Sequence, residues 1–266
     1  MSNFSQIGTV FAANKEEEDS QTVADKNGGA KWIWGKDFKT QNNWTAFRKT
    51  VKLDSIPEKV VAKIAIDSKY WLYINDKLVV FEGEAKRGPN KTDTYMDQVD
   101  IAKYLKSGEN TIAVLGEYFG RDGYSYSSSG HAGFLFEANA TGVNIVSDES
   151  WKVLKLDAYG ASATKIPNER IVESCIRYDA QEEVSGWQTS SFDDSDWDNA
   201  IAYGIEGDEP WNKLVDRTIP ELKFDEDYRI FDQSAIKETQ DSDSSTMFEI
   251  PTDDYAIEAT FTVANQ

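Results

Sequence analysis

Residues 69–81 read "KYWLYINDKLVVF", and this stretch has the pattern of a β-hairpin. Apolar and aromatic side chains alternate with a period of two, which places neighbouring residues on opposite faces of a strand. One face carries Tyr70, Leu72 and Ile74, and the other carries Trp71 and Tyr73. Asn75 and Asp76 tolerate positive φ, and an apolar run follows them and ends at Phe81. The stretch therefore predicts two antiparallel strands joined by a tight turn.

Strand-type alternation continues on both sides of this hairpin. In "KVVAKIAID", residues 59–67, one face is formed by Val60, Ala62, Ile64 and Ile66. Further stretches of this kind are 44–53, 93–105, 110–119, 131–139, 144–156 and 169–180, with one helical turn at the end of 93–105. No segment keeps a helical period over about ten residues, and turn residues separate the strands. The chain is therefore predicted to be an all-β sandwich of about nine or ten strands.

The pattern divides the chain into four parts. Residues 1–30 are polar, and we expect an arm or linker there, before a sandwich at 31–205. Residues 206–245 alternate little and end in polar low-complexity sequence, so they predict an irregular linker. Alternation resumes in 246–266 and predicts a further strand. Because a strand needs partners, this one pairs back with the sandwich or opens a further β region that is cut short.

Composition narrows the classes of partner. The chain has 28 Lys+Arg against 47 Asp+Glu and a formal net charge of −19, so phosphate-rich nucleic acid and anionic membrane surfaces would be repelled. No stretch approaches the roughly 18 apolar residues of a membrane helix. Neither nucleic acid nor membrane is therefore expected as a partner. The eight Trp, 12 Tyr and 13 Phe suit β-structure first and stacking on sugars second.

Cysteine and histidine exclude several kinds of site. Cys175 is the one cysteine, so the chain forms no internal disulfide, and one cysteine with one histidine cannot build a thiolate zinc cluster. Cys175 lies in the alternating run "IVESCIRY" and is expected to be a small core residue. The one histidine, His131, falls in a long loop.

The acidic segment "FDDSDW", residues 192–197, raises the question of a metal loop. Asp194, Asp196 and Asp198 have the spacing of the first three ligands of an EF-hand calcium loop. That loop also requires glycine and glutamate where this chain has Asn199 and Ile205, so the template fails. A looser calcium site elsewhere in the chain stays open, because β-sandwich sugar modules often hold one.

The same segment does not suit a catalytic carboxylate pair. Asp193 and Asp194 are neighbours, and neighbours on an extended chain point to opposite faces, so they cannot flank one glycosidic bond. Asp and Ser side chains accept backbone N–H groups in turns, and aromatic residues can then anchor the turn to a core. We therefore expect a structural turn pinned by Trp187, Phe192 and Trp197, with no catalytic residue in it.

A long loop between two predicted strands is the first candidate ligand site. It reads "GEYFGRDGYSYSSSGHAGF", residues 116–134, and long loops in compact domains are usually functional or disordered. Flat rings for stacking and fixed donors and acceptors for sugar hydroxyls are what a neutral sugar requires. The loop offers Tyr118, Phe119, Arg121, Asp122, Tyr124, Tyr126 and His131. The alternative is a packed loop that only covers an edge of the sandwich.

A second candidate loop spans residues 83–95, "GEAKRGPNKTDTY". Its polar side chains Arg87, Asn90 and Asp93 could assist the first loop in binding a sugar. The alternative is a solvated connection between two strands.

Several motifs taken together resemble a known family. They are "WIW" and "FRKTVKL" within 32–53, "KYWLYINDKLV" at 69–79, the stretch 88–116, "SDESWKV" at 147–153, the stretch 178–200 and "PWNKLVDRTIP" at 210–220. In this order they resemble the N-terminal β-sandwich region of bacterial α-L-rhamnosidases and related family 78 glycoside hydrolases, from about Lys31 to Pro220. The segment "FDDSDW" also resembles the galactose-binding-like jelly roll of β-galactosidases and β-glucuronidases. This chain departs from the rhamnosidase pattern in having Asp at position 76, commonly Gly, and Gln at position 181, commonly Arg.

The resemblance implies a galactose-binding-like jelly roll that supports a separate catalytic domain. In that family the catalytic acids lie in a downstream (α/α)6 barrel, which this sequence does not contain. The chain is thus expected to be a non-catalytic accessory domain of an α-L-rhamnosidase. Its expected partners are the catalytic domain of the same polypeptide and a carbohydrate such as a rhamnose-containing glycan. The alternatives are a purely structural packing domain, the sugar-binding jelly roll of a β-galactosidase-like enzyme, and an enzyme that hydrolyses glycosides with its own loop carboxylates.

Overall fold

The computed structural model describes residues 29–83, 90, 92–123, 127–161, 176–222, 237–240 and 246–249. The chain divides into two units, with the boundary between Leu222 and Lys223. The described part of the first unit is built from strands and short 3-10 turns, as the sequence predicts. Nowhere in the described ranges is there a helix with the length and apolar character of a membrane span.

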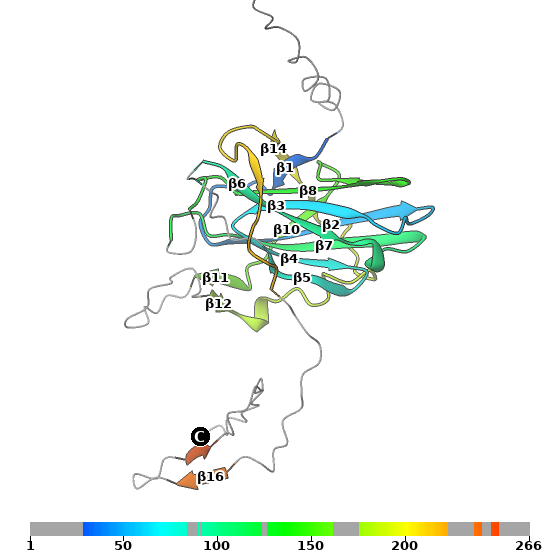
Figure 1. Ribbon diagram of the computed structural model, residues 1–266. Helices are drawn as coiled ribbons and strands as arrows, with labels where there is room; N and C mark the ends of the chain where they lie inside the picture. Colours follow the sequence, from blue (N-terminus) through cyan, green and yellow to red (C-terminus); the bar gives the residue numbers. More distant parts are fainter. Residues whose placement is uncertain are drawn as a thin grey trace, which may run out of the picture. The chain divides into compact units, whose positions relative to one another are not determined.

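Two large sheets form the sandwich of the first unit (Figure 1). In the first sheet the order is β14 (Ile201–Ile205), β1 (Lys31–Trp34), β8 (Gly133–Ala140), β3 (Val61–Asp67), β6 (Thr94–Asp100) and β15 (Leu214–Asp216), with β9 (Val143–Val146) paired to β8. In the second it is β13 (Asp198–Asn199), β10 (Lys152–Lys155), β2 (Asn43–Leu53), β7 (Gly108–Tyr118), β4 (Lys69–Ile74) and β5 (Lys77–Gly83). β15 runs parallel to β6, whereas the other described pairs are antiparallel. This arrangement confirms the predicted jelly-roll β-sandwich.

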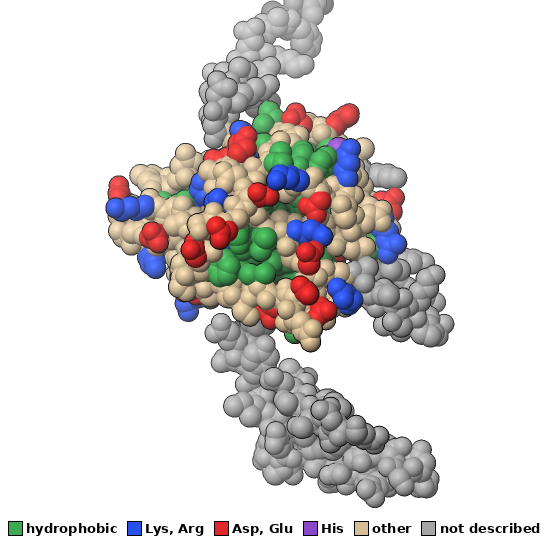
Figure 2. All heavy atoms as spheres, turned by 180° about the vertical axis from the view of Figure 1, so that it is seen from behind, with side chains coloured by type: hydrophobic (Ala, Val, Ile, Leu, Met, Phe, Trp, Pro, Cys, Tyr) green, Lys and Arg blue, Asp and Glu red, His purple; other side chains and the backbone are tan. Residues whose placement is uncertain are grey.

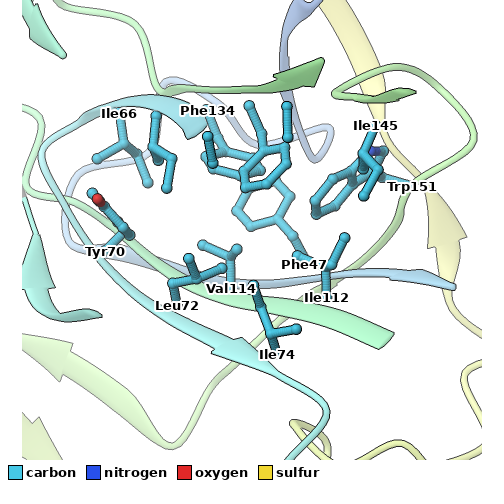
Figure 3. Close-up of a cluster of buried hydrophobic side chains, with 14 of the residues drawn as sticks. Phe47, Ile66, Tyr70, Leu72, Ile74, Ile112, Val114, Phe134, Ile145 and Trp151 are labelled. Carbon is cyan, nitrogen blue, oxygen red and sulfur yellow. The ribbon is translucent and has the colours of Figure 1, made fainter. Parts of the chain in front are cut away.

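The main core lies between the two sheets. Figure 3 shows Phe47, Leu72, Ile112 and Val114 from the second sheet facing Ile66 and Phe134 from the first, with Trp151 closing one side. The four alternating residues predicted to share a face in and just before β3 are fully buried, namely Val60, Ala62, Ile64 and Ile66. Apolar burial at about 25 cal/mol per Å² is the main force that holds the sheets together.

The hairpin at residues 69–81 forms as predicted. Tyr70, Leu72 and Ile74 are buried in the core, and the alternating Trp71 and Tyr73 lie half-buried on the outer face. The turn residues Asn75 and Asp76 have φ of 48° and 71°, the positive values that a tight hairpin turn requires. The helical turn predicted after the strand at 93–105 is the 3-10 turn η1 (Ala102–Tyr104).

Later segments cover the outer faces of both sheets. The outer face of the second sheet is covered by the hairpin of β11 (Tyr159–Ala161) and β12 (Ile176–Tyr178), the 3-10 turn η3 (Ala180–Glu182) and the loop around Trp187 and Trp197. On the first sheet, Trp211 stacks on Trp32, with ring centroids 4.7 Å apart. The sandwich is therefore closed on the outside by segments that follow its main strands in sequence.

The expected parts beyond the sandwich are described only in places. The expected linker at 206–245 contains β15, which pairs with β6, and β16 (Lys237–Gln240). β16 pairs with β17 (Thr246–Glu249) in a two-stranded sheet in the second unit. Residues 1–28 of the expected arm and Cys175 lie outside the described residues. The domain boundaries given above stay a prediction.

Candidate functional site

A buried carboxylate at the end of β3 holds the long loop that follows β7. Asp67 is fully buried. Its Oδ2 accepts hydrogen bonds from the backbone N–H of Ser129, at 2.8 Å, and from the Ser129 hydroxyl, at 2.5 Å. A carboxylate in this position is compensated by charge-assisted hydrogen bonds rather than by water. The loop therefore has a fixed attachment point at one end of the sandwich.

The neighbouring Ser68 attaches the other end of the same loop. Its hydroxyl donates to Asp67 Oδ1, at 3.1 Å, and accepts from the backbone N–H of Phe119, also at 3.1 Å. The hydroxyl of Ser129 in turn accepts from the backbone N–H of His131, at 3.2 Å. Residues 67 and 68 thus bind Phe119 near the start of the loop and Ser129 near its end.

Arg121 and Asp122 are the exposed charged residues of this loop. The guanidinium of Arg121 lies 4.6 Å from the ring centre of the buried Phe119, a cation–π contact that positions it at the surface. Asp122 Oδ1 accepts from the backbone N–H of Ser128, at 3.1 Å. A charged donor and a charged acceptor are therefore exposed at neighbouring positions of the loop, and their role in a sugar site stays a prediction.

His131 lies at the rim of the loop between aromatic side chains. Its ring makes edge contacts with Phe38 and Trp211, at centroid distances of 5.4 Å and 6.3 Å. Burial lowers the pKa of His131, the positive charge of Lys39 lowers it further, and Asp67 opposes this shift. The imidazole is thus neutral near pH 7. Figure 2 shows this one histidine (purple) at the surface beside a basic and a hydrophobic side chain.

Tyr118 does not offer an exposed ring, contrary to its assignment as a stacking platform. Its side chain is 1% exposed and packs edge-on against Trp34, with ring centroids 6.4 Å apart. Burial raises the pKa of Tyr118 to about 12, with a smaller rise from Asp67, while a hydrogen bond with Ser128 lowers it. The residue is part of the core beneath the loop. Tyr124 and Tyr126 lie outside the described residues.

The second candidate loop is described only at its end. Asn90 Oδ1 accepts from the backbone N–H groups of Thr92 and Asp93, at 3.0 and 2.9 Å, and Asn90 Nδ2 donates to Asp93 Oδ2, at 2.8 Å. These bonds make Asn90 the organising residue of a turn. Arg87 lies outside the described residues.

The acid–Trp segment is anchored by two of the three aromatic residues that the sequence predicts as buried. Trp187 and Trp197 are 7% and 8% exposed, whereas Phe192 is half-buried. The buried Arg48 of β2 donates from Nε to Asp194 Oδ2, at 2.7 Å, and its other nitrogens donate to carbonyl oxygens of the segment. Asp193 Oδ1 accepts from the backbone N–H of Ser195, at 3.0 Å. The carboxylates therefore hold the turn together.

Among the described side chains, no three of His, Cys, Asp and Glu gather closely enough to hold a metal ion. A calcium site stays a prediction without assigned ligands. The residue that sequence reasoning missed in the candidate site is Asp67. The one sequence signal for it was an acidic residue at the end of an apolar strand, which many surface turns share.

Comparison with known proteins identifies relatives of this sandwich. The family model for the α-L-rhamnosidase N-terminal domain matches residues 90–226, just over half of the chain. The crystal structure of a GH78-family rhamnosidase from Bacillus sp. GL1 is 30% identical, with a TM-score of 0.64, over 72% of this chain and 20% of that one. No curated protein matches the chain.

Two more distant rhamnosidases share the fold. The α-L-rhamnosidase from Dictyoglumus thermophilum is 22% identical, with a TM-score of 0.54, over 74% of this chain and 23% of that one. The enzyme from Aspergillus terreus is 19% identical, with a TM-score of 0.56, over 82% of this chain and 25% of that one. The chain spans about a fifth to a quarter of the length of these solved rhamnosidases. With a family model that covers half of its length and a sandwich of the same fold, the chain belongs to the family of α-L-rhamnosidase N-terminal domains.

Proposed function

We propose that this chain is the accessory β-sandwich of an α-L-rhamnosidase, that it takes no part in bond cleavage, and that it binds neutral carbohydrate. Its partners in this proposal are the catalytic domain of the same polypeptide and a glycan, such as one that contains rhamnose. The family match supports the first part of the proposal, because the matched region in the relatives is an N-terminal domain.

The observation that carries carbohydrate binding is the loop held on Asp67. A neutral sugar offers no charge, so its affinity comes from ring stacking and from hydroxyl hydrogen bonds to groups fixed before binding. Both ends of the loop are anchored by residues 67 and 68, and its surface presents Arg121, Asp122 and the neutral His131. These groups provide donors and acceptors on a backbone that loses little freedom on binding.

The environments of three acids, two buried and one half-buried, support a role without catalysis. Asp67 and Asp194 are engaged with loop backbone and with Arg48, and Asp97 accepts from the hydroxyl of Tyr70, at 2.9 Å, and from Arg217. A catalytic carboxylate must face a substrate. These three face the protein and hold its segments together.

NMR titration of the chain with L-rhamnose and D-galactose tests carbohydrate binding. Saturable shifts in the amide resonances of residues 119–123 and 127–132 are expected, at dissociation constants of about 0.1–10 mM, which corresponds to ~3–5 kcal/mol. Arg121→Ala should weaken the binding, and Lys103→Ala, a substitution of an exposed cation on η1, should not. Absence of any shift at high sugar concentration would leave a structural packing domain as the better description.

A further inference from the structure

The segment that follows Trp211 lies along one edge of the first sheet. Residues 213–222, called the strap below, come directly after Asn212, whose φ of 52° is a left-handed value that asparagine tolerates at a turn. The strap contains β15, the last strand of that sheet, which pairs in parallel with β6 over three residues. Parallel pairing is slightly less stable per residue than antiparallel pairing, and a strand at the end of a sheet has only one neighbour. The strand pairing by itself is therefore a weak attachment of the strap.

A buried ion pair adds a much stronger attachment. Arg217 Nε donates to Asp97 Oδ1, and the two side chains are 13% and 2% exposed. Asp97 has the same parity in β6 as the core residue Val99, and its Oδ2 accepts from the hydroxyl of Tyr70, at 2.9 Å. Figure 3 shows Tyr70, which belongs to the second sheet, at the side of the core opposite Trp151. The cation of the strap thus binds a carboxylate that joins the two sheets.

Two backbone hydrogen bonds enclose β15. The backbone N–H of Thr94 donates to the carbonyl oxygen of Lys213, and that of Arg217 donates to the carbonyl oxygen of Met96, both at 3.0 Å. Thr94 is fully buried. Its amide hydrogen therefore exchanges with water only when the strap is away from β6, which makes it a reporter for the position of the strap.

Little apolar surface holds the strap in place. Leu214 is 9% exposed, whereas all of residues 218–222 are exposed. The apolar side chains of Ile219 and Leu222 are 67% and 57% exposed. Because a segment with few buried apolar contacts opens at a lower free energy than core strands do, the ion pair has a large share in keeping the strap closed.

We propose that the strap opens as a unit about Asn212 while the sandwich stays folded, and that the ion pair of Arg217 with Asp97 keeps it closed. The first unit ends at Leu222, so the chain leaves this unit through the strap. A closed strap fixes that exit beside β6. An open strap frees the exit and exposes backbone groups at the edge of β6, which are able to pair with another strand. This conformational device is independent of the carbohydrate binding proposed above.

Amide hydrogen exchange of the full chain, followed by NMR, tests the proposal. The amides of Thr94 and Arg217 should exchange faster than those of Phe47 and Val114, which lie in the central strands β2 and β7. Low concentrations of urea should hardly change the rates of Thr94 and Arg217, because a local opening exposes little surface.

Variants of the ion pair test the role of Arg217. Arg217→Met should speed exchange of the Thr94 amide by about 10- to 100-fold, the range that a hydrogen bond to a charged group contributes to an equilibrium. Lys213→Met removes an exposed cation of the same strap and should leave that rate unchanged. Because Arg217→Met also leaves Asp97 buried without this cation, the double variant Asp97→Asn/Arg217→Met removes both charges and should still show fast exchange at Thr94.

Three results would overturn the proposal. The same rate and urea dependence for Thr94 as for Val114 would show that the strap opens only when the whole sandwich unfolds. A native rate for Thr94 in the double variant would show that the ion pair does not keep the strap closed. An equal increase for Thr94, Phe47 and Val114 in the double variant would show that the pair stabilises the sandwich as a whole.

Discussion

Arg48 Nε donates a 2.7 Å hydrogen bond to Asp194 Oδ2 across 146 residues of sequence. The same guanidinium also donates to the carbonyl oxygens of Trp187, Thr189 and Phe192, and its side chain is 2% exposed. One buried cation on β2 therefore organises the whole acid–Trp segment. The segment lies on the outer face of the second sheet. There its carbonyl oxygens and Asp194 compensate the charge of Arg48, which would otherwise be buried without a partner.

Replacing this cation should strongly destabilise the sandwich. Arg48→Met retains the length of the side chain but leaves Asp194 and three carbonyl oxygens without their donor. Breaking a buried pair in this way costs about 3–5 kcal/mol. Urea denaturation measures the free energy of unfolding.

Lys49→Met, at the next residue, is the matched control. The ammonium group of Lys49 lies 3.9 Å from Asp148 near the surface, and such pairs contribute about 0–1 kcal/mol. If the two variants unfold at the same urea concentration, Arg48 does not have the organising role described here.

Trp197 should be the main apolar anchor of the same segment. It is 8% exposed and meets the half-buried Phe192 edge-on, at a centroid distance of 5.6 Å. Trp197→Ala empties a large aromatic site, for which a cost of about 3–5 kcal/mol is expected. Phe192→Ala should lower the free energy of unfolding by clearly less, because part of the Phe192 ring is already exposed to water. Thermal unfolding followed by circular dichroism compares them, and an unchanged midpoint for Trp197→Ala would refute the anchoring role.

Gly133 should be intolerant of any side chain. A Cβ at this position would lie 2.6 Å from the ring of the buried Trp211, so the ring, which stacks on Trp32, would have to shift. Gly133→Ala is expected to cost about 1–3 kcal/mol through overpacking. Gly160→Ala is the control, because its nearest contact would be at 3.9 Å. Equal unfolding free energies for both variants would contradict the packing described for Trp211.

The isolated chain should not cleave aryl α-L-rhamnosides. The expectation follows from the proposed accessory role and from the structural engagement of Asp67, Asp97 and Asp194. Release of p-nitrophenol from its α-L-rhamnoside, followed by absorbance, measures the activity. Turnover that disappears when an acidic residue of this chain is substituted would show that the domain carries catalysis of its own.

The alternation of apolar residues was enough to predict the sandwich. The same alternation also predicts that Tyr118 faces the core and not the loop surface. Tyr118 has the same parity in β7 as the core residues Ile112 and Val114, so alternation alone places its ring inward. Assigning it to the loop ignored that period. The hairpin turn at Asn75 and Asp76 needed no tertiary information, because two residues that tolerate positive φ suffice.

The attachments between distant segments were not predictable in this way. The bonds from Ser129 to Asp67 join residues 62 positions apart, and the parallel pairing of β15 with β6 joins Leu214 to Thr94. In the sequence, Arg48 is one polar residue among others in an alternating strand. The neighbouring residues do not show that a distant segment will cover the sheet face on which Arg48 lies.

His131 should make the stability of the domain depend on pH in the mildly acidic range. Burial, and then the charge of Lys39, lower its pKa in the folded state below the ordinary 6.5, and Asp67 only partly offsets this. As pH falls through that ordinary value, the unfolded chain binds a proton that the folded chain does not, so stability is lost until the folded pKa is reached. Urea denaturation between about pH 7.5 and pH 5 should therefore show a steeper loss for the native sequence than for His131→Gln, which cannot titrate. Parallel curves, or a steeper loss for the variant, would contradict the lowered pKa of this half-buried imidazole at the rim of the loop.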